Sequence, residues 1–235
     1  MKLLAWMILP LMVLSTYVVS AQDAPKPDTT DEKKSDEKKE DEGEESKEAE
    51  KEKEVEVEPD KATLDKLAPS FTLKNADGKD VKLADFKGKI VVLEWINLDC
   101  PWCKAHYEDG DALVKMQGDL RKEDVVWLTI CSSGAGKQGN FEGDTLKKRI
   151  EKVSLKTEHY LIDADGAVGK KYEAKTTPHC YVIDKEQKLR YRGALDNLRD
   201  RRKDKALEEV NYVKLAIDAL KADKKIDKTD TKPYG

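Results

Sequence analysis

The chain has 235 residues, of which 39% are charged and 38% hydrophobic, and its formal net charge at pH 7 is −4. The charges are mixed in sign and no long basic block occurs, which argues against a nucleic-acid-binding protein. Four cysteines are too few for a small scaffold held together by disulfides. We therefore expect one ordinary folded domain with a real hydrophobic core.

The first 21 residues predict an export signal. Lys2 gives a positive start, residues 3–19 are almost wholly apolar, and Val19-Ser20-Ala21 suits cleavage after Ala21. If it is not cleaved, the segment only just reaches across a bilayer of about 30 Å and would act as a membrane anchor. Either outcome predicts an extracytoplasmic protein, periplasmic or secreted, in a compartment where disulfides persist.

Residues 22–60 form a separate, strongly acidic region with 18 Asp and Glu, 8 Lys and no aromatic residue. Such a segment cannot bury enough apolar surface to offset the entropy lost on ordering. It predicts a charged disordered tether, with a specific acidic binding tail as the alternative. The folded domain is expected over residues 61–222, and residues 223–235 are set apart as a C-terminal tail.

Hydrophobic periodicity and turn residues predict strands that alternate with helices. The predicted strands, in chain order, span residues 71–73, 81–83, 90–97, 125–131, 160–162, 181–183 and 189–191. The predicted helices span residues 101–121, 144–153, 166–172 and 205–222. Asp77-Gly78 lies between the first two strands and is typical of a β-hairpin turn. The continuous apolar runs 90–97 and 125–131 predict strands that are covered on both faces.

Individual residues refine the predicted helices and the loop between them. Gly110 and Gly118 weaken the helix expected over 101–121, and Asp144 is expected to cap the next helix. The Gly-rich stretch 132–143 is long for a loop in a compact domain, a length typical of functional or mobile loops. The buried side of the last helix is predicted to be formed by Leu207, Val210, Val213, Leu215, Ile217 and Leu220.

The motif Cys100-Pro101-Trp102-Cys103 follows the apolar strand and opens the first helix. Two thiols at this spacing can form a reversible disulfide, and a helix start stabilises the first of them as a thiolate. Pro101 suits the first helical turn, where its missing N–H would have been unpaired. Zinc binding would need further ligands, and no second C-x-x-C occurs in the chain. The motif therefore predicts a redox couple rather than a static disulfide.

The order of elements, with C-x-x-C after the first long strand and Thr176-Thr177-Pro178 before the last hairpin, resembles the thioredoxin fold. Several segments resemble the redoxin (AhpC/TSA-like) branch of that superfamily. They are residues 68–73, 83–89, 95–101, 138–140, 174–179 and 191–196. The resemblance implies an α/β protein whose central mixed β-sheet is flanked by helices, with an N-terminal β-hairpin extension. It covers about residues 66–222.

The resemblance implies roles for individual residues. Cys100 is expected to attack a substrate disulfide, and Cys103 to resolve the mixed disulfide. Glu94 corresponds to a buried acid that helps to move the proton of the second cysteine, and its apolar neighbours should raise its pKa. Pro178 is expected to be a cis-proline that faces the motif and turns the backbone of Thr177 toward an extended substrate.

Other candidates are less defined. Trp102 is expected either to receive an apolar substrate or to pack on the loop 132–143. His179 is the candidate for contact with Cys100, whereas His106 is expected on the helix flank. Cys131 and Cys180 should lie on strands on opposite sides of the C-x-x-C strand, near 10 Å apart and beyond disulfide reach. They are interpreted as inert buried thiols, with an auxiliary thiol or soft metal ligand as the alternative.

The predicted function is that of an extracytoplasmic thiol–disulfide oxidoreductase that needs no cofactor beyond the Cys100–Cys103 couple. Its expected partners are protein disulfides and a thiol electron donor or acceptor, with no nucleic acid. A thiol peroxidase is one alternative, but Leu93 and Asn97 stand where peroxidases of this family carry proline and a hydroxyl residue. A Cu(I) carrier using Cys100, Cys103 and His179 is another, and a non-catalytic interaction module is a third.

Overall fold

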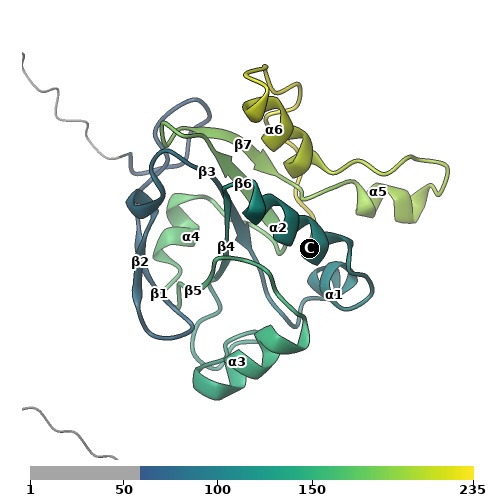
Figure 1. Ribbon diagram of the computed structural model, residues 1–235. Coiled ribbons are helices and arrows are strands. Elements are labelled where there is room, and N and C mark those ends of the chain that lie inside the picture. The colour runs from purple at the N-terminus through teal and green to yellow at the C-terminus, as the bar shows by residue number, and fades with distance from the viewer. Residues whose placement is uncertain (1–58) are drawn as a thin grey trace, which may run out of the picture. The chain divides into compact units, whose positions relative to one another are not determined.

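The computed structural model describes residues 59–235; the predicted signal segment 1–21, and the predicted tether as far as residue 58, lie outside the described residues. A central sheet carries helices on both faces (Figure 1). Its strands are β1 (Thr72–Asn75), β2 (Asp80–Lys82), β3 (Ile90–Trp95), β4 (Val125–Cys131), β5 (His159–Ile162), β6 (His179–Ile183) and β7 (Leu189–Gly193). The helices are η1 (Leu83–Phe86, a 3-10 helix), α1 (Pro101–Tyr107), α2 (Ala112–Lys122), α3 (Gly143–Lys152), α4 (Ala167–Lys171), α5 (Leu198–Lys203) and α6 (Tyr212–Lys221).

The strand order is β2-β1-β5-β4-β3-β6-β7. The strands β3, β4 and β5 are parallel to one another, whereas β6 pairs antiparallel with β3 and forms an antiparallel hairpin with β7. The hairpin β1–β2 extends the other edge through antiparallel pairing of β1 with β5. This is a thioredoxin-like fold with an N-terminal hairpin extension, and the predicted fold class is confirmed.

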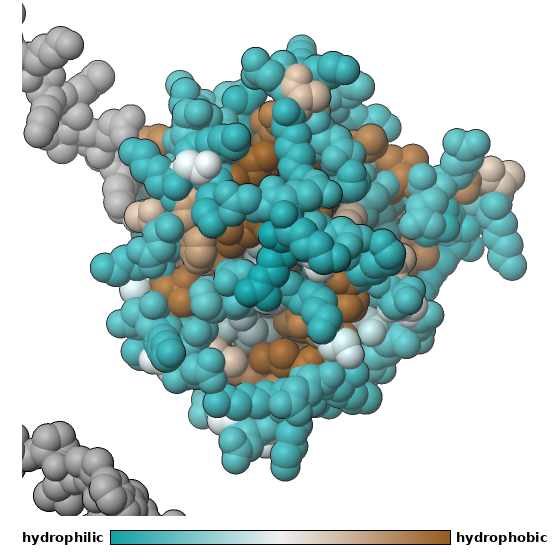
Figure 2. Space-filling model, in the orientation of Figure 1, coloured by the Kyte–Doolittle hydropathy of each residue, from teal (hydrophilic) through white to brown (hydrophobic). Residues whose placement is uncertain are grey.

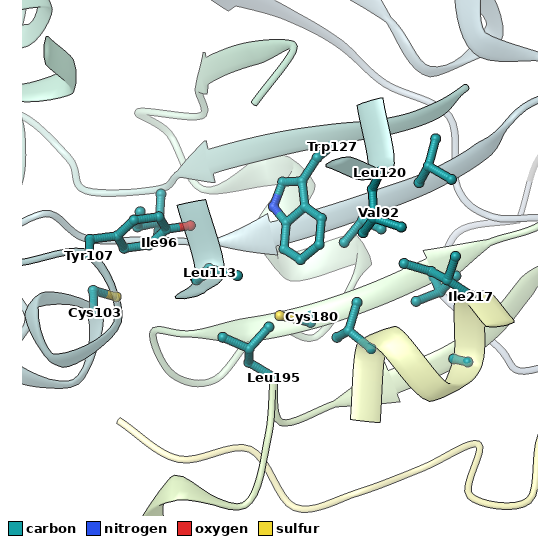
Figure 3. Packing of buried hydrophobic residues seen from close by; sticks show 14 of the residues in the cluster. Val92, Ile96, Cys103, Tyr107, Leu113, Leu120, Trp127, Cys180, Leu195 and Ile217 are labelled. Atoms are coloured by element: carbon teal, nitrogen blue, oxygen red, sulfur yellow. The ribbon is translucent and has the colours of Figure 1, made fainter. Parts of the chain in front are cut away.

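The core has two layers because side chains alternate across the central strands. On one face Val92 and Ile96 pack with residues of α1, α2, α3 and α6, and Cys180 points into the same cluster (Figure 3). On the other face Val91 and Leu93 pack with residues of α4, η1 and the segment that precedes β1. Both β3 and β4 are buried along their full length, as their continuous apolar runs predicted.

The prediction of a single helix over residues 101–121 is wrong. The chain forms α1 and α2, separated by residues 108–111, which include Gly110. Glycine at an exposed position gives little support to a continuing helix, and the break lets the two helices bury different side chains. Tyr107 of α1 reaches a buried acid, whereas Leu113 and Leu120 of α2 pack in the core. Gly118, which carries the same helix penalty, lies within α2.

Two predicted helix starts also differ from the structure. Helix α3 begins at Gly143, and Glu142 rather than Asp144 holds the N-cap position. The last helix begins at Tyr212 rather than near Lys205, because the Asn211 side chain caps it by accepting a hydrogen bond from the Lys214 N–H at 2.9 Å. The short helix α5 precedes it and was not predicted.

The residues predicted to form the buried side of the last helix are only partly correct. Val213, Ala216 and Ile217 are buried, whereas Leu215 is 57% exposed and Leu207, before the helix, is 45% exposed. Leu215 is two residues after Val213 and is therefore turned by about 200° from it. Ala216, which was not predicted, takes the inward place at the i+3 position.

This difference within one helix predicts a stability contrast. Ile217→Ala should lower the free energy of unfolding by about 2–5 kcal/mol, because it removes a fully buried side chain and leaves a cavity. Leu215→Ala should change it by less than about 0.5 kcal/mol, because the side chain is mostly exposed. Urea unfolding of both variants measures the contrast, and equal losses would contradict this orientation of α6.

Residues 223–235, set apart in the sequence as a tail, pack on the domain. Ile226 and Tyr234 are buried, and Asp230 forms a parallel bridge with Arg192 of β7. In the view of Figure 2 charged and polar side chains dominate the surface, and apolar ones appear only in small separate groups. Between residues 59 and 235 no helix has the length and apolarity needed to cross a membrane.

Candidate functional site

The motif Cys100-Pro101-Trp102-Cys103 lies at the carboxyl end of β3. Cys100 holds the N-cap position of α1 and Pro101 begins the helix, as the sequence predicted. The Cys100 thiol is half-buried and donates a hydrogen bond to the Thr177 carbonyl at 3.0 Å, whereas Cys103 is buried. Neither is joined in a disulfide in this structure.

The surroundings shift the two thiols in opposite directions. The pKa of Cys100 is lowered to about 5, chiefly by a hydrogen bond from the Cys103 side chain and further by the backbone N–H groups of Trp102 and Cys103, while partial burial opposes the shift. The pKa of Cys103 is raised because its side chain is hydrogen-bonded to Cys100, buried, and close to the Glu94 charge. Lys104 Nζ, on the same helix, lies 4.0 Å from the Asp99 carboxylate. At neutral pH these shifts favour a thiolate at Cys100 and a protonated thiol at Cys103.

Glu94 is fully buried in β3, on the sheet face covered by α1. Its Oε2 accepts hydrogen bonds from the Tyr107 hydroxyl at 2.6 Å and the Trp127 indole N–H at 2.9 Å. Gln117 in turn donates to the Tyr107 hydroxyl at 2.8 Å. The other oxygen, Oε1, has no hydrogen-bond partner among residues 59–235. Burial raises the pKa of Glu94 to about 7, although the two hydrogen bonds oppose the shift.

The loop before β6 forms the opposite wall of the site. The Thr177–Pro178 peptide bond is cis, as the resemblance implied. The Thr177 carbonyl is the hydrogen-bond acceptor for Cys100, so the cis-proline loop and the motif are in direct contact.

Asn97, which replaces the peroxidase hydroxyl, anchors the loop 132–143. Its side-chain amide donates to the Gln138 carbonyl at 3.1 Å, and its Oδ1 accepts from the Asp99 N–H at 2.8 Å. A Cβ on Gly139 would lie 2.3 Å from that Oδ1, so only glycine permits this approach. The part played here by Asn97 is to hold the backbone beside Cys100.

Trp102 is half-buried. Its ring meets the edge of Tyr234 at a centroid distance of 5.0 Å, and the Arg202 guanidinium lies 4.5 Å from the indole centroid. His106 is buried on the flank of α1, with Nε2 3.1 Å from the Tyr234 hydroxyl and Nδ1 3.7 Å from the Asp196 carboxylate. Burial lowers the pKa of His106.

His179 does not meet Cys100. It is the register partner of Trp95, whereas Cys180 is the partner of Glu94 and shares the face covered by α1. His179 therefore points to the opposite face, where its Nδ1 lies 3.1 Å from the Tyr181 hydroxyl. Burial lowers its pKa to about 4. The three ligands of the alternative copper site do not converge, and within residues 59–235 no group of three His, Cys, Asp or Glu is placed to hold a metal ion.

Cys131 and Cys180 lie on β4 and β6, which flank β3 on opposite sides as expected. Both are buried free thiols. Cys131 donates to the Gly139 carbonyl at 3.5 Å, and burial raises the pKa of Cys180. Neither thiol is bridged in this structure, and their interpretation as inert core residues stays a prediction.

The residues that surround the two cysteines were not predicted from the sequence. Tyr107, Gln117 and Trp127 come from three elements and meet only around Glu94. Asp196 and Tyr234 meet only at the end of α1. No spacing pattern signals these contacts, although a buried glutamate in an apolar strand does signal that hydrogen-bond donors must surround it.

Comparisons with known proteins agree with this geometry. The AhpC/TSA family model matches residues 64–192. The thiol-disulfide oxidoreductase ResA of Bacillus thuringiensis subsp. konkukian is 27% identical over 131 residues, 55% of this chain and 69% of that protein. An uncharacterized conserved protein from Geobacillus kaustophilus has a similar structure, with a TM-score of 0.61, 30% identity, and coverage of 76% of this chain and 97% of its own. A hypothetical protein from Sinorhizobium meliloti has a TM-score of 0.63, 26% identity, and coverage of 74% and 92%.

Proposed function

This chain belongs to the AhpC/TSA family, and from that premise we propose that it exchanges protein disulfides outside the cytoplasm through a Cys100–Cys103 couple. Its relatives support an oxidoreductase of the thiol–disulfide type. The observation that carries the proposal is the opposite shift of the two cysteine pKa values within one motif. The two cysteines of a purely structural disulfide need not differ in thiol pKa, whereas a redox pair needs one sulfur that is readily ionised and one that stays protonated.

In the first step the Cys100 thiolate attacks one sulfur of the substrate disulfide. The new bond is a mixed disulfide between Cys100 and the substrate, and the second substrate sulfur leaves as a thiolate. The Thr177 backbone, beside Cys100, is placed to pair with an extended substrate on either side of the attacked cystine.

In the second step Cys103 loses its proton and attacks the sulfur of Cys100. The substrate leaves as a second thiolate, so it gains two electrons, and the chain keeps a Cys100–Cys103 disulfide. Glu94, whose pKa is raised to about 7 and whose Oε1 is unpartnered in the described part of the chain, acts as the proton acceptor. A thiol donor must then reduce the disulfide if turnover is to continue.

Location outside the cytoplasm rests on the predicted export signal in residues 1–21, with membrane attachment only if that segment is retained. In an oxidising compartment protein disulfides persist as substrates for the pair, whereas cytoplasmic thiol pools keep most cysteines reduced. The expected partners are protein disulfides and a thiol donor or acceptor.

The test is the reduction potential of Cys100–Cys103, measured in metal-free protein by glutathione titration with thiol trapping. A Cys100 pKa of about 5 stabilises the reduced form more than in thioredoxin, whose corresponding pKa is about 7. We therefore expect one two-electron transition between roughly −270 and −120 mV. Absence of a reversible transition would reject the proposal, and rapid sulfenic acid formation at Cys100 with peroxide would favour the peroxidase alternative.

A further inference from the structure

The segment 226–235 crosses the sheet edge and ends on the candidate site. Ile226 is buried at its start. The Arg192 N–H of β7 donates to the Thr229 carbonyl at 2.9 Å, and the Thr231 N–H donates back to the Arg192 carbonyl at 3.1 Å. The segment is therefore held by main-chain pairing, as a short added strand would be.

A close backbone approach fixes the middle of this segment. The Thr231 hydroxyl accepts from the Ala194 N–H at 2.9 Å and lies 2.6 Å from the Tyr191 hydroxyl. Gly193 has a φ of +141°, and a Cβ there would lie 2.2 Å from the Thr231 Oγ1. The glycine is required for the segment to lie where it does.

The segment then places Tyr234 in a pocket formed by Trp102, His106 and Asp196, here called the tyrosine pocket. The Tyr234 side chain is 5% exposed, and its ring meets Trp102 edge-on at 5.0 Å. Its hydroxyl donates to the Asp196 carboxylate and lies 3.1 Å from His106 Nε2. The pocket therefore offers an aromatic wall and two polar partners for one hydroxyl.

The next residue, Gly235, lies against the cis-proline loop. A Cβ on Gly235 would be 2.4 Å from the Thr177 carbonyl oxygen and 2.8 Å from the Thr177 nitrogen. These are the backbone groups through which an extended polypeptide would add to the loop. Residue 235 therefore covers the Thr177 backbone, which the proposed reaction assigns to the substrate, and residue 234 packs on the Trp102 ring, which the sequence offered as a contact for an apolar substrate.

We propose that the tyrosine pocket is a subsite for a tyrosine side chain of a polypeptide substrate, and that residues 229–235 fill it until the substrate displaces them. This inference rests on the proposed function and adds a substrate preference to it. The segment is a competitor within the chain, so it reduces the apparent affinity of a polypeptide that enters the tyrosine pocket in proportion to the fraction of time that the pocket is free.

The polar partners in the pocket give it selectivity. The side chains of Asp196 and His106 are each only 8% exposed. An occupant without a hydroxyl would leave His106 Nε2 without the hydrogen bond it makes here, whereas Asp196 would keep the Leu198 N–H. A site built to hydrogen-bond a hydroxyl rejects analogues that lack it more strongly than an apolar pocket rejects extra bulk. Tyrosine is therefore preferred over phenylalanine and over small residues.

The experiment compares two disulfide-linked model peptides, with Tyr or with Ala at the positions next to the cystine. Tyr234→Ala should raise kcat/KM for the Tyr peptide about tenfold and for the Ala peptide clearly less, because the competitor no longer fills the pocket. Thr231→Val removes the hydroxyl that accepts from the Ala194 N–H, so the segment is held less tightly although Tyr234 is unchanged. It should also raise kcat/KM for the Tyr peptide, by a smaller factor. Lys232→Ala, an exposed change in the same segment, is the matched control and should leave both rates unchanged.

Two further readouts separate this inference from the proposed function. Alkylation of Cys100 by iodoacetamide should change less than about twofold in Tyr234→Ala, because a small reagent does not need the pocket. A linear Tyr peptide without cysteine should accelerate amide hydrogen exchange in residues 229–235, and this holds even if no disulfide is reduced. Equal gains for both peptides, a slower Tyr234→Ala variant, or no exchange response to the linear peptide would each overturn the inference.

Discussion

Replacing Cys100 by serine should abolish disulfide reduction, with a loss of at least about a thousandfold in rate. Cys100 is the only cysteine of the described chain that combines partial exposure with a lowered pKa, near 5. A serine hydroxyl is not ionised at neutral pH and cannot form the mixed disulfide. The rate is measured with an insulin or model-peptide disulfide and a thiol donor.

Cys103→Ser separates the two steps of the same reaction. This variant keeps the attacking thiolate but cannot resolve the mixed disulfide, so a covalent adduct with the substrate should accumulate and be visible by mass spectrometry. Cys131→Ala is the control, because that thiol is buried on β4 and has no part in the proposed steps. A Cys131→Ala variant as inactive as Cys100→Ser, or an active Cys100→Ser variant, would contradict the assignment.

Replacing Glu94 by glutamine should slow the resolving step roughly a hundredfold, because the proton acceptor for Cys103 is lost. In the unchanged protein that step should accelerate as pH rises through about 7, where Glu94 becomes ionised. The variant should lose this titration while Cys100 still reacts with iodoacetamide at its ordinary rate. Rapid-mixing measurements of attack and of resolution, at several pH values, distinguish the two steps.

The same substitution should change how stability depends on pH. Burial raises the Glu94 pKa from 4.5 to about 7, so the folded state holds this proton more tightly than the unfolded chain. The resulting stability is fully present below pH 4.5 and is lost as pH rises to about 7, a decrease of about 3 kcal/mol. Glu94→Gln should remove this part of the slope, whereas an unchanged slope would show that Glu94 is not the group responsible.

The surface salt bridges contribute much less to stability, and to its dependence on pH, than the buried Glu94 does. Lys115–Asp119 and Lys214–Asp218 join exposed side chains one helical turn apart. Such pairs contribute about 0.3–0.5 kcal/mol and are screened by salt. The buried Glu94 carboxylate, the Cys100 thiol of lowered pKa and the buried His179, whose pKa is lowered to about 4, therefore contribute more to the predicted pH response than these surface pairs do.

The sequence by itself determined the strands and the position of the C-x-x-C motif at the start of a helix, and it predicted that the two thiols form a redox pair. Continuous apolar runs identified β3 and β4 because a strand buried on both faces needs no polar positions. The spacing of Cys100 and Cys103 at a helix start was enough to predict the couple, since both the helix and the short separation are local properties. The hairpins followed in the same way from turn residues such as Asp77-Gly78.

Only the tertiary structure decided what surrounds that pair. The face of α6, the orientation of His179 and the donors around Glu94 depend on which elements pack together, and no local periodicity records this. The placement of Tyr234 beside Trp102 joins residues more than a hundred positions apart in the chain. Contacts of this kind arise from the register of the sheet and the path of the last segment, so the composition of residues 223–235 predicted only a tail where the fold forms a wall of the site.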